Sequence, residues 1–449
     1  MKPIEKLFCI LALLVCCSCR QEETIPVDID FSLLIKGENH TSPLVVTITN
    51  DTKNAEAYLW TFEGGEPATS DKKDPGNVTF TLPGEHQVSL EAWNGGDRNS
   101  KTLTIHVDSA VTLDFKADAE INNYAPAIFN IKNLSSGGVS YKWIFEGGEP
   151  ASYEGVNPPA VTYAEQGSYT IILLANNGSS DFITSQSIEV REPLDASFTI
   201  VPSFEDMDDM EAPLRATLDT WLQGVESLEW ECEGATINNG NSPDANILFS
   251  EAGEYTVYLN VSNGKQSKRL SQEISVKPNT NLRIHKNIRL GINTAFETIG
   301  SFYSTQLRRS FKRSEIDNTN GPFIDIAFLG LNADYIYNLF VSPDKLSDTP
   351  LLEIEGAKAT KFVNKLEAGN EVQLTSGQFN TMTTDVYLKN LPISSVSYGD
   401  EYFTKSGLPR VVLFETSDRR KGAILIKEMV SNGKENSYIL VDIKIQKND

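Results

Sequence analysis

The sequence predicts an all-β protein, with three similar β-sandwiches in tandem followed by a different β-rich domain. A tryptophan within a short alternating strand recurs at Trp60, Trp143 and Trp230, at intervals of 83 and 87 residues. Each tryptophan is followed by a turn, a longer apolar strand and an Asn-Gly pair. Short alternating strands between regular turn signals are typical of sandwiches of about 80–90 residues. The repeat ends near residue 278, which leaves the last part of the chain for the fourth domain.

The first residues predict an export signal. Two lysines precede an apolar stretch over 7–17, which is too short for a membrane-spanning helix of about 20 residues. The motif Cys16-Cys17-Ser18-Cys19 that ends it resembles a bacterial lipobox, in which a small residue precedes the cysteine that receives the lipid.

This resemblance implies a lipoprotein signal peptide over 1–18, a lipid on Cys19 and a linker over 19–26 from the lipid anchor. Cys17 is the alternative site, and a plain secreted protein is the alternative to lipidation. The acidic residues after Cys19 resemble the surface-export signal of Bacteroidetes lipoproteins. Beyond this region the chain keeps one cysteine, Cys232, so no intrachain disulfide framework is expected.

The repeat units share further features besides the tryptophan. In the first two, Phe-Glu-Gly-Gly-Glu-Pro begins two residues after the tryptophan. The long strand of each unit runs into an Asn-Gly pair, which predicts a hairpin because both residues tolerate positive φ. These pairs are Asn94-Gly95, Asn177-Gly178 and Asn263-Gly264.

These units resemble PKD domains, a family of immunoglobulin-like β-sandwiches marked by a Trp-x-Phe-x-Gly core. The third unit departs from the first two, with Cys232 in place of Phe and Ala235 in place of the second Gly. The resemblance implies core tryptophans and a role as spacer or interaction module. It predicts PKD-like domains over 27–107, 108–191 and 192–278.

The segment 279–449 differs from the repeats. It has no Trp, and its 21 basic and 20 acidic residues nearly balance, whereas the residues before it have 18 basic and 41 acidic. Its β-branched and partly alternating runs predict a β-rich domain. The stretch 413–447 resembles the C-terminal module of lipoproteins in polysaccharide-utilisation loci, so a glycan-binding domain is implied.

Composition and motifs argue against several functions. The 39 basic against 61 acidic residues disfavour nucleic acid, whose binding depends on dense Lys and Arg contacts. The four histidines are isolated from one another, and no nucleotide-binding or hydrolase motif occurs. We therefore expect a non-catalytic protein without a cofactor or metal, although two catalytic carboxylates distant in sequence stay an open alternative.

Two charged runs have alternative interpretations. The acidic run 205–211 has oxygen ligands at alternating positions that could hold calcium, but it lacks the glycine of an EF-hand loop, so a solvated loop is favoured. The basic run 308–313 could bind a sulfated or uronate sugar. Its alternative is a solvated face that balances an acidic neighbour.

Sugar binding requires exposed aromatic rings on which pyranose faces stack. The candidates in the last domain are Tyr398, Tyr402 and Phe403 first, and Tyr335 and Tyr337 second. Trp93, next to a hairpin turn, and Trp221, at a position that differs among the repeats, are the candidates in the sandwiches. Core packing or an isolated surface ring is the alternative for each of them.

Together these features predict a lipid-anchored, cell-surface protein of the outer membrane that binds a polysaccharide. It resembles Bacteroidetes surface glycan-binding lipoproteins, which implies that it passes the glycan to outer-membrane glycosidases and an importer. The alternative is a surface adhesin or assembly protein that binds a protein partner. A broad apolar patch would favour the latter.

Overall fold

The structure is a computed structural model that describes residues 25–364, 374–393, 402–406 and 408–447. It is nearly all β, as the sequence predicts. The described chain falls into two compact units, and the boundary between them crosses the third sandwich. The first unit holds residues up to 197 with 221–228 and 260–269, and the second holds 198–220, 229–259 and the chain from 270.

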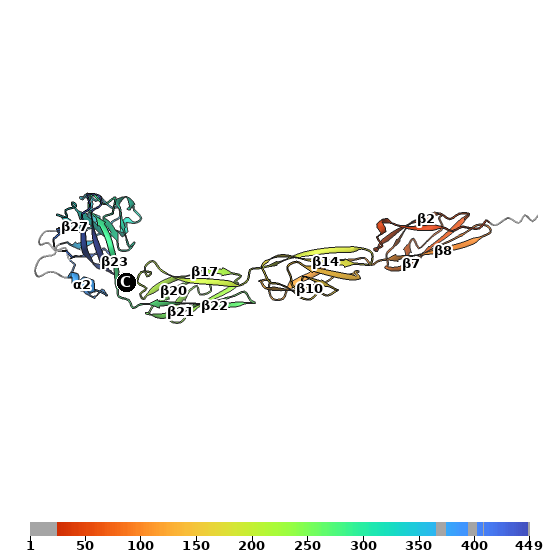
Figure 1. The fold of residues 1–449 in the computed structure, drawn as a ribbon, viewed down its shortest axis with the longest axis horizontal. Coiled ribbons are helices and arrows are strands. Elements are labelled where there is room, and N and C mark those ends of the chain that lie inside the picture. Colours follow the sequence, from red (N-terminus) through yellow and green to blue (C-terminus); the bar gives the residue numbers. More distant parts are fainter. Residues whose placement is uncertain (1–24, 365–373, 394–401, 407, 448–449) are drawn as a thin grey trace, which may run out of the picture. The chain divides into compact units, whose positions relative to one another are not determined.

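The first sandwich consists of two antiparallel sheets with the strand orders β1-β2-β6-β4 and β5-β3-β7-β8 (Figure 1). A short 3₁₀ helix, η1 (Lys36–Glu38), follows its first strand. The strands are β1 (Phe31–Ile35), β2 (Leu44–Asn50), β3 (Ala57–Phe62), β4 (Gly65–Glu66), β5 (Thr69–Ser70), β6 (Gly76–Phe80), β7 (Gly84–Trp93) and β8 (Arg98–Val107).

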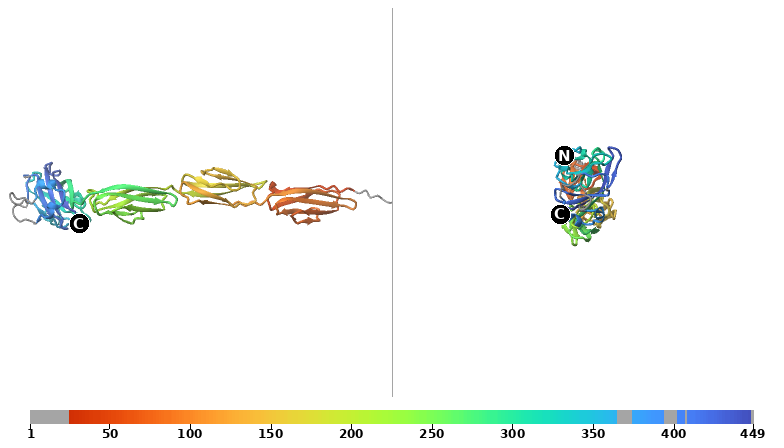
Figure 2. Two further views of the ribbon diagram at one scale, coloured as in Figure 1. Left: turned by 90° about the horizontal axis from the view of Figure 1, so that it is seen from below. Right: turned by 90° about the vertical axis from the view of Figure 1, so that its left-hand side faces the viewer.

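The second sandwich repeats this plan with the strand orders β13-β10-β9 and β12-β11-β14-β15. Figure 2 shows the strands from two further directions. The strands of the second sandwich are β9 (Phe115–Ala119), β10 (Ala127–Asn133), β11 (Ser140–Phe145), β12 (Ser152–Glu154), β13 (Val161–Tyr163), β14 (Gly167–Asn176) and β15 (Asp181–Val190).

The third sandwich has the strand orders β16-β17-β20-β19 and β18-β21-β22. Its strands are β16 (Asp195–Pro202), β17 (Leu214–Gln223), β18 (Ser227–Cys232), β19 (Thr236–Asn238), β20 (Asn246–Phe249), β21 (Gly253–Ser262) and β22 (Ser267–Val276).

The predicted core tryptophans are buried. Trp60 and Trp143 are 0% exposed and Trp230 is 5% exposed. Each lies on a strand whose side chains alternate between the core and the outside.

The predicted hairpins are also present. β7 pairs with β8 and β14 with β15 in antiparallel register, and β21 and β22 lie side by side in their sheet. The connections are four-residue loops, in which the Asn side-chain oxygen accepts backbone N–H bonds from the residues two and three positions later. Gly178 and Gly264 have φ of 111° and 83°, a conformation that glycine adopts without steric cost.

The last domain contains a five-stranded sheet, β23-β31-β30-β29-β28, and a four-stranded sheet, β25-β24-β26-β27. Its first strand, β23, pairs with its last, β31, so the chain enters and leaves at one edge of the larger sheet. The strands are β23 (Leu282–Gly291), β24 (Phe302–Ser304), β25 (Arg309–Phe311), β26 (Ile326–Gly330), β27 (Asn338–Val341), β28 (Lys361–Val363), β29 (Arg410–Glu415), β30 (Lys421–Val430) and β31 (Tyr438–Gln446).

Hydrophobic cores lie on both faces of the larger sheet. Leu290, Phe328, Ile424 and Val441 are fully buried in a core that both sheets contribute to. A second core packs β29 and β30 against two short helices, so both strands are buried on both faces and do not alternate. The helical segments are η2 (Arg313–Glu315), η3 (Gly321–Phe323), η4 (Pro343–Lys345), α2 (Ser376–Thr381) and α3 (Val386–Lys389).

Candidate functional site

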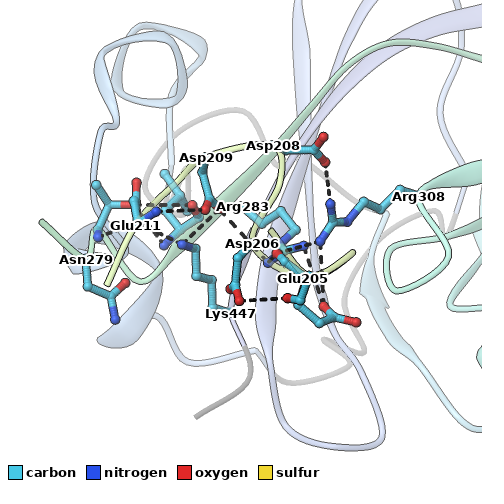
Figure 3. Close-up of polar contacts among 12 residues, drawn as sticks. Glu205, Asp206, Asp208, Asp209, Glu211, Asn279, Arg283, Arg308 and Lys447 are labelled. Carbon is cyan, nitrogen blue, oxygen red and sulfur yellow. Dashed lines mark hydrogen bonds and ion pairs between the residues drawn. The ribbon is translucent and has the colours of Figure 1, made fainter. Parts of the chain in front are cut away.

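The acidic loop 203–213, which joins β16 to β17, is held against the last domain. Within the loop, the Asp206 carboxylate accepts hydrogen bonds from the Ser203 hydroxyl at 2.7 Å and the Arg215 amide at 2.9 Å. These bonds close the loop on itself. The neighbouring carboxylates therefore lie on its outer side, where Figure 3 shows them turned toward three cations of the last domain.

Two arginines bind the first half of the acidic loop. Arg308 lies 2.5 Å from the Asp208 carboxylate and donates to the Glu205 carbonyl at 2.7 Å. Arg283 donates to the same carbonyl at 2.5 Å and lies 3.7 Å from the Glu205 carboxylate. The Arg308 and Arg283 side chains are 8% and 14% exposed, whereas their carboxylate partners are 57–60% exposed, so the guanidinium groups are sheltered from water and the carboxylates are not.

The end of the chain binds the second half of the acidic loop. The Lys447 ammonium lies 2.9 Å from the Asp209 carboxylate and 2.8 Å from that of Glu211. Glu211 also accepts hydrogen bonds from the Thr280 amide at 2.7 Å and the Thr280 hydroxyl at 2.9 Å. Thr280 and Lys447 flank the paired strands β23 and β31. Their hydrogen bonds and ion pairs therefore join this edge of the larger sheet to the acidic loop.

These contacts differ from the solvated loop that the sequence favours for the acidic run 205–211. Its side chains form ion pairs and hydrogen bonds with the protein, so it is more than a solvated loop. Among the residues that the structure describes, no three His, Cys, Asp or Glu side chains are grouped so as to hold a metal ion.

The basic run 308–313 divides into a buried and an exposed part. Arg308 balances the acidic loop, in agreement with one of the two interpretations, whereas Arg309 is exposed. The segment forms a turn, the strand β25 and the 3₁₀ helix η2.

An open groove of about 640 Å³ lies beside the acidic loop. The bulged middle of β23 and the strand β25 supply most of its lining. Its charged and polar side chains include His285, Lys286, Arg289, Tyr303, Arg308 and Arg309. Asp208, which pairs with Arg308, also lines it.

His285 and Tyr303 form a buried polar pair beneath this groove. They are 7% and 3% exposed, and the Tyr303 hydroxyl lies 3.0 Å from Nδ1 of His285. Burial lowers the pKa of His285 to about 4 and raises the pKa of Tyr303, so both are neutral near pH 7. The other ring nitrogen of His285, Nε2, is buried and has no hydrogen-bond partner in the described structure.

Tyr335 and Phe403 are buried, so their prediction as exposed sugar-stacking rings is wrong. Tyr335 is 0% exposed, and its hydroxyl lies 2.7 and 2.8 Å from two carbonyl oxygens at the ends of β30 and β31. It has φ of 54°, which breaks the expected alternation with its neighbours. Phe403 is 2% exposed and packs between Phe340 and the Arg410 guanidinium.

Tyr337 and Tyr402 are brought together at the surface. Their rings stack with centroids 4.4 Å apart and 29° between the ring planes, and both side chains are partly exposed. They reach this arrangement because the segment around Phe403 pairs with Asn338 through two backbone hydrogen bonds. Their role in sugar binding stays a prediction.

The remaining candidates lie apart from this pair. Trp93 is half-buried, and the Arg98 guanidinium lies 4.5 Å from its ring centroid. Trp221 is 53% exposed on β17. Tyr398 and the predicted lipid site Cys19 lie outside the described residues, so both stay predictions.

Sequence reasoning did not select His285, Tyr303, Arg283 or Lys447. Arg283 is an isolated basic residue in β23, and Lys447 is one just after β31. The pairing of β23 with β31 brings both of them to the acidic loop. His285 falls at a polar position of the alternating stretch 282–285, so no signal in the sequence marked it as buried.

Residues 37–107 match the family model of the PKD domain. The chain is similar to polycystin-1 of Homo sapiens, with 26% identity over 179 residues, which cover 35% of this chain and 4% of polycystin-1. The chain therefore spans a small fraction of that relative's length. No helix in the described part of the chain is long and apolar enough to cross a membrane.

Solved structures that match part of this chain include the titin I-band fragment I67–I69, with 13% identity, a TM-score of 0.31 and coverage of 56% of this chain and 99% of the fragment. Sidekick-1 immunoglobulin domains 1–5 have 10% identity, a TM-score of 0.24 and coverage of 56% and 60%. The chain is thus a tandem of immunoglobulin-like β-sandwiches, with a PKD domain at residues 37–107.

Proposed function

We propose that the chain is a non-catalytic cell-surface protein that binds polysaccharide through its last domain. The tandem sandwiches act as spacers between a lipid anchor at Cys19 in the outer membrane and this domain. The bound glycan is then available to glycosidases and an importer in the same membrane. PKD and other immunoglobulin-like domains suit such an adhesive or binding role.

The observation that carries this proposal is the stacked pair of Tyr337 and Tyr402. Pyranose rings have apolar faces that pack on aromatic rings, while nearby polar groups bind the hydroxyls. Tyrosine suits such a surface because its ring is apolar and its hydroxyl stays wet. The stacking of the two rings at 4.4 Å also fixes their orientation, which lowers the entropy lost when a ligand binds.

The test uses residues 20–449, which omit only the predicted signal peptide and Cys19. Affinity electrophoresis through gels with neutral and acidic polysaccharides identifies a glycan that retards the chain. Tyr337→Ala and Tyr402→Ala should each weaken that binding about 5- to 150-fold, by analogy with aromatic stacking on nucleic-acid bases. Tyr387→Ala is the control, because Tyr387 is 44% exposed on α3 and has no part in the pair.

Retention of full affinity in both variants would place the binding site elsewhere. A chain that binds no polysaccharide in a broad panel would contradict the proposal itself.

A second candidate function is adhesion to a protein partner. Leu331 and Ile336 are 48% and 55% exposed and flank the turn that ends at Tyr337. Exposed apolar side chains beside an aromatic pair are one feature of a protein-binding surface. Ile336→Glu separates the two functions, because it should abolish protein binding and leave stacking on Tyr337 and Tyr402 intact.

A further inference from the structure

We infer that the groove lined by His285, Lys286, Arg289 and Arg309 binds the carboxylate or sulfate groups of an acidic polysaccharide. The inference rests on the proposed function and adds a second site, with a stated ligand chemistry, on the same domain. The groove lies at the β25 edge of the four-stranded sheet, whereas Tyr337 precedes β27 at the other edge.

Three cations of the groove are available to a ligand. Lys286, Arg289 and Arg309 are exposed, and none of them forms an ion pair with another described residue. The Arg289 guanidinium lies 5.1 Å from the ring centroid of Tyr438, and that of Arg309 lies 3.9 Å from the ring of Phe311. Each ring supports one face of the guanidinium and leaves its N–H edge free to donate to an oxyanion.

The backbone places Lys286 at the groove. The pairing of β23 with β31 shifts register between His285 and Ile288, which marks a β-bulge. Asn287 within the bulge has φ of 60°. Its amide donates to the Asp442 carboxylate at 2.7 Å, and its side-chain oxygen accepts from Lys427 at 2.6 Å. The bulge is therefore held in place, and Lys286 with it.

Two buried nitrogens at the groove have no partner in the described structure: Nε2 of His285 and Nε of Arg308. The His285 residue is 7% exposed and the Arg308 side chain 8% exposed. Leaving such a group unpaired costs free energy, so buried polar atoms normally have partners. In the tautomer in which the Tyr303 hydroxyl donates to Nδ1, the neutral His285 ring carries its proton on Nε2. Both nitrogens are then donors, which suits an oxygen-rich anion.

The charge distribution supports binding of an acidic glycan by a local group of cations and not by the net charge of the chain. The formal net charge of the chain is −22, so a polyanion meets overall repulsion. Residues 279–449 hold 21 basic and 20 acidic residues, so the attraction must come from how the cations are grouped. Binding through grouped cations should weaken steeply as salt is added.

The experiment compares residues 20–449 with two triple variants that lose the same charge from the same domain. The groove variant carries Lys286→Gln, Arg289→Gln and Arg309→Gln. The control carries Lys345→Gln, Lys358→Gln and Lys434→Gln, all three exposed outside the groove. The probes are polygalacturonate for carboxylates, dextran sulfate for sulfate esters and unmodified dextran as a neutral chain, measured by calorimetric titration at 50 and 300 mM NaCl.

We expect the unaltered chain to bind one of the acidic probes, with an affinity that falls at the higher salt concentration. The groove variant should lose at least about 10-fold in affinity and the control less than about 2-fold. The stronger acidic probe identifies carboxylate or sulfate as the ligand group. Equal losses in the two variants would overturn the inference, as would an unaltered chain that binds neither acidic probe. Binding to neutral polysaccharides alone would overturn this inference and leave the proposed function standing.

Discussion

At the residue scale, the repeated tryptophan does more than fill the core. The indole Nε1 of Trp60, Trp143 and Trp230 donates to a carbonyl twelve residues later, at 3.0, 3.0 and 3.1 Å. A phenylalanine from the first strand of each sandwich packs edge-on against the indole. The hydrogen bond explains why this position needs Trp, because Phe would leave the carbonyl without its donor.

Trp143→Ala should destabilise the second sandwich by about 3–5 kcal/mol, the usual cost of deleting a large buried aromatic side chain. Hydrogen exchange of the intact chain measures this locally, as lost protection in β11 and β14. Trp221→Ala is the matched control, since Trp221 is 53% exposed and its removal should change stability by less than about 0.5 kcal/mol. Similar exchange in both variants would contradict the core role of Trp143.

His285 should make the last domain sensitive to mild acid. Burial lowers its pKa to about 4. The charge of Asp208 opposes this shift and that of Arg420 adds to it. In the unfolded chain the pKa of a histidine is about 6.5, so the unfolded state binds more protons between these values. Its stabilising contribution is therefore complete above about pH 6.5 and is lost as the pH falls toward 4.

Between pH 7.5 and 5.5 this loss should be about 1–1.5 kcal/mol. Because residues 279–449 contain no Trp, a calorimetric transition without a change in Trp fluorescence belongs to this domain. His285→Gln should flatten the pH dependence of that transition. An unchanged slope in the variant would mean that other groups cause it.

At the scale of elements, local patterns predicted the sandwiches well and the last domain poorly. Alternation and Asn-Gly turns act over a few residues, so the core tryptophans and hairpins could be inferred from sequence. Tyr335 and Phe403 could not, because their burial depends on β30, β31 and β27, which lie far along the chain. The strands β29 and β30 lack alternation because helices cover their second face.

The ion pairs of the acidic loop could not be predicted from the sequence either, because they also join segments that lie far apart in the chain. Arg308 and Arg309 are adjacent basic residues, yet one is buried against Glu205 and Asp208 and the other is exposed in the groove. Arg308 lies in the turn before β25 with φ of 56°, whereas Arg309 begins the strand, and sequence alone does not say which of the two meets the loop.

Arg308→Ala should loosen the acidic loop by about 1–3 kcal/mol, because it removes charge-assisted bonds to Asp208 and to the Glu205 carbonyl. Hydrogen exchange over 203–213 should rise in this variant. Arg309→Ala, which removes the same charge one residue away, should leave that exchange unchanged. Equal effects of the two substitutions would show that the loop responds to net charge and not to these contacts.

At the scale of the whole molecule, charge is divided along the chain. The residues before 279 hold 18 basic and 41 acidic side chains, whereas the last domain is nearly neutral. A strongly acidic run of sandwiches disfavours nonspecific binding to anionic surfaces, and it leaves the last domain as the part suited to an acidic ligand. The division therefore agrees with spacer sandwiches and a binding domain at the end of the sequence.

In the proposed function the chain is attached at its N-terminal end, and we predict that Cys19 carries the lipid. The apolar stretch 7–17 ends close to Ser18-Cys19, the arrangement that resembles a lipobox. Cys19→Ala should move the protein from the membrane fraction to the soluble fraction and abolish labelling by radioactive palmitate. Cys17→Ala is the control and should keep both the label and the membrane location. The opposite result, with label kept in Cys19→Ala and lost in Cys17→Ala, would move the anchor to Cys17, and loss in neither variant would remove the lipid from the proposal.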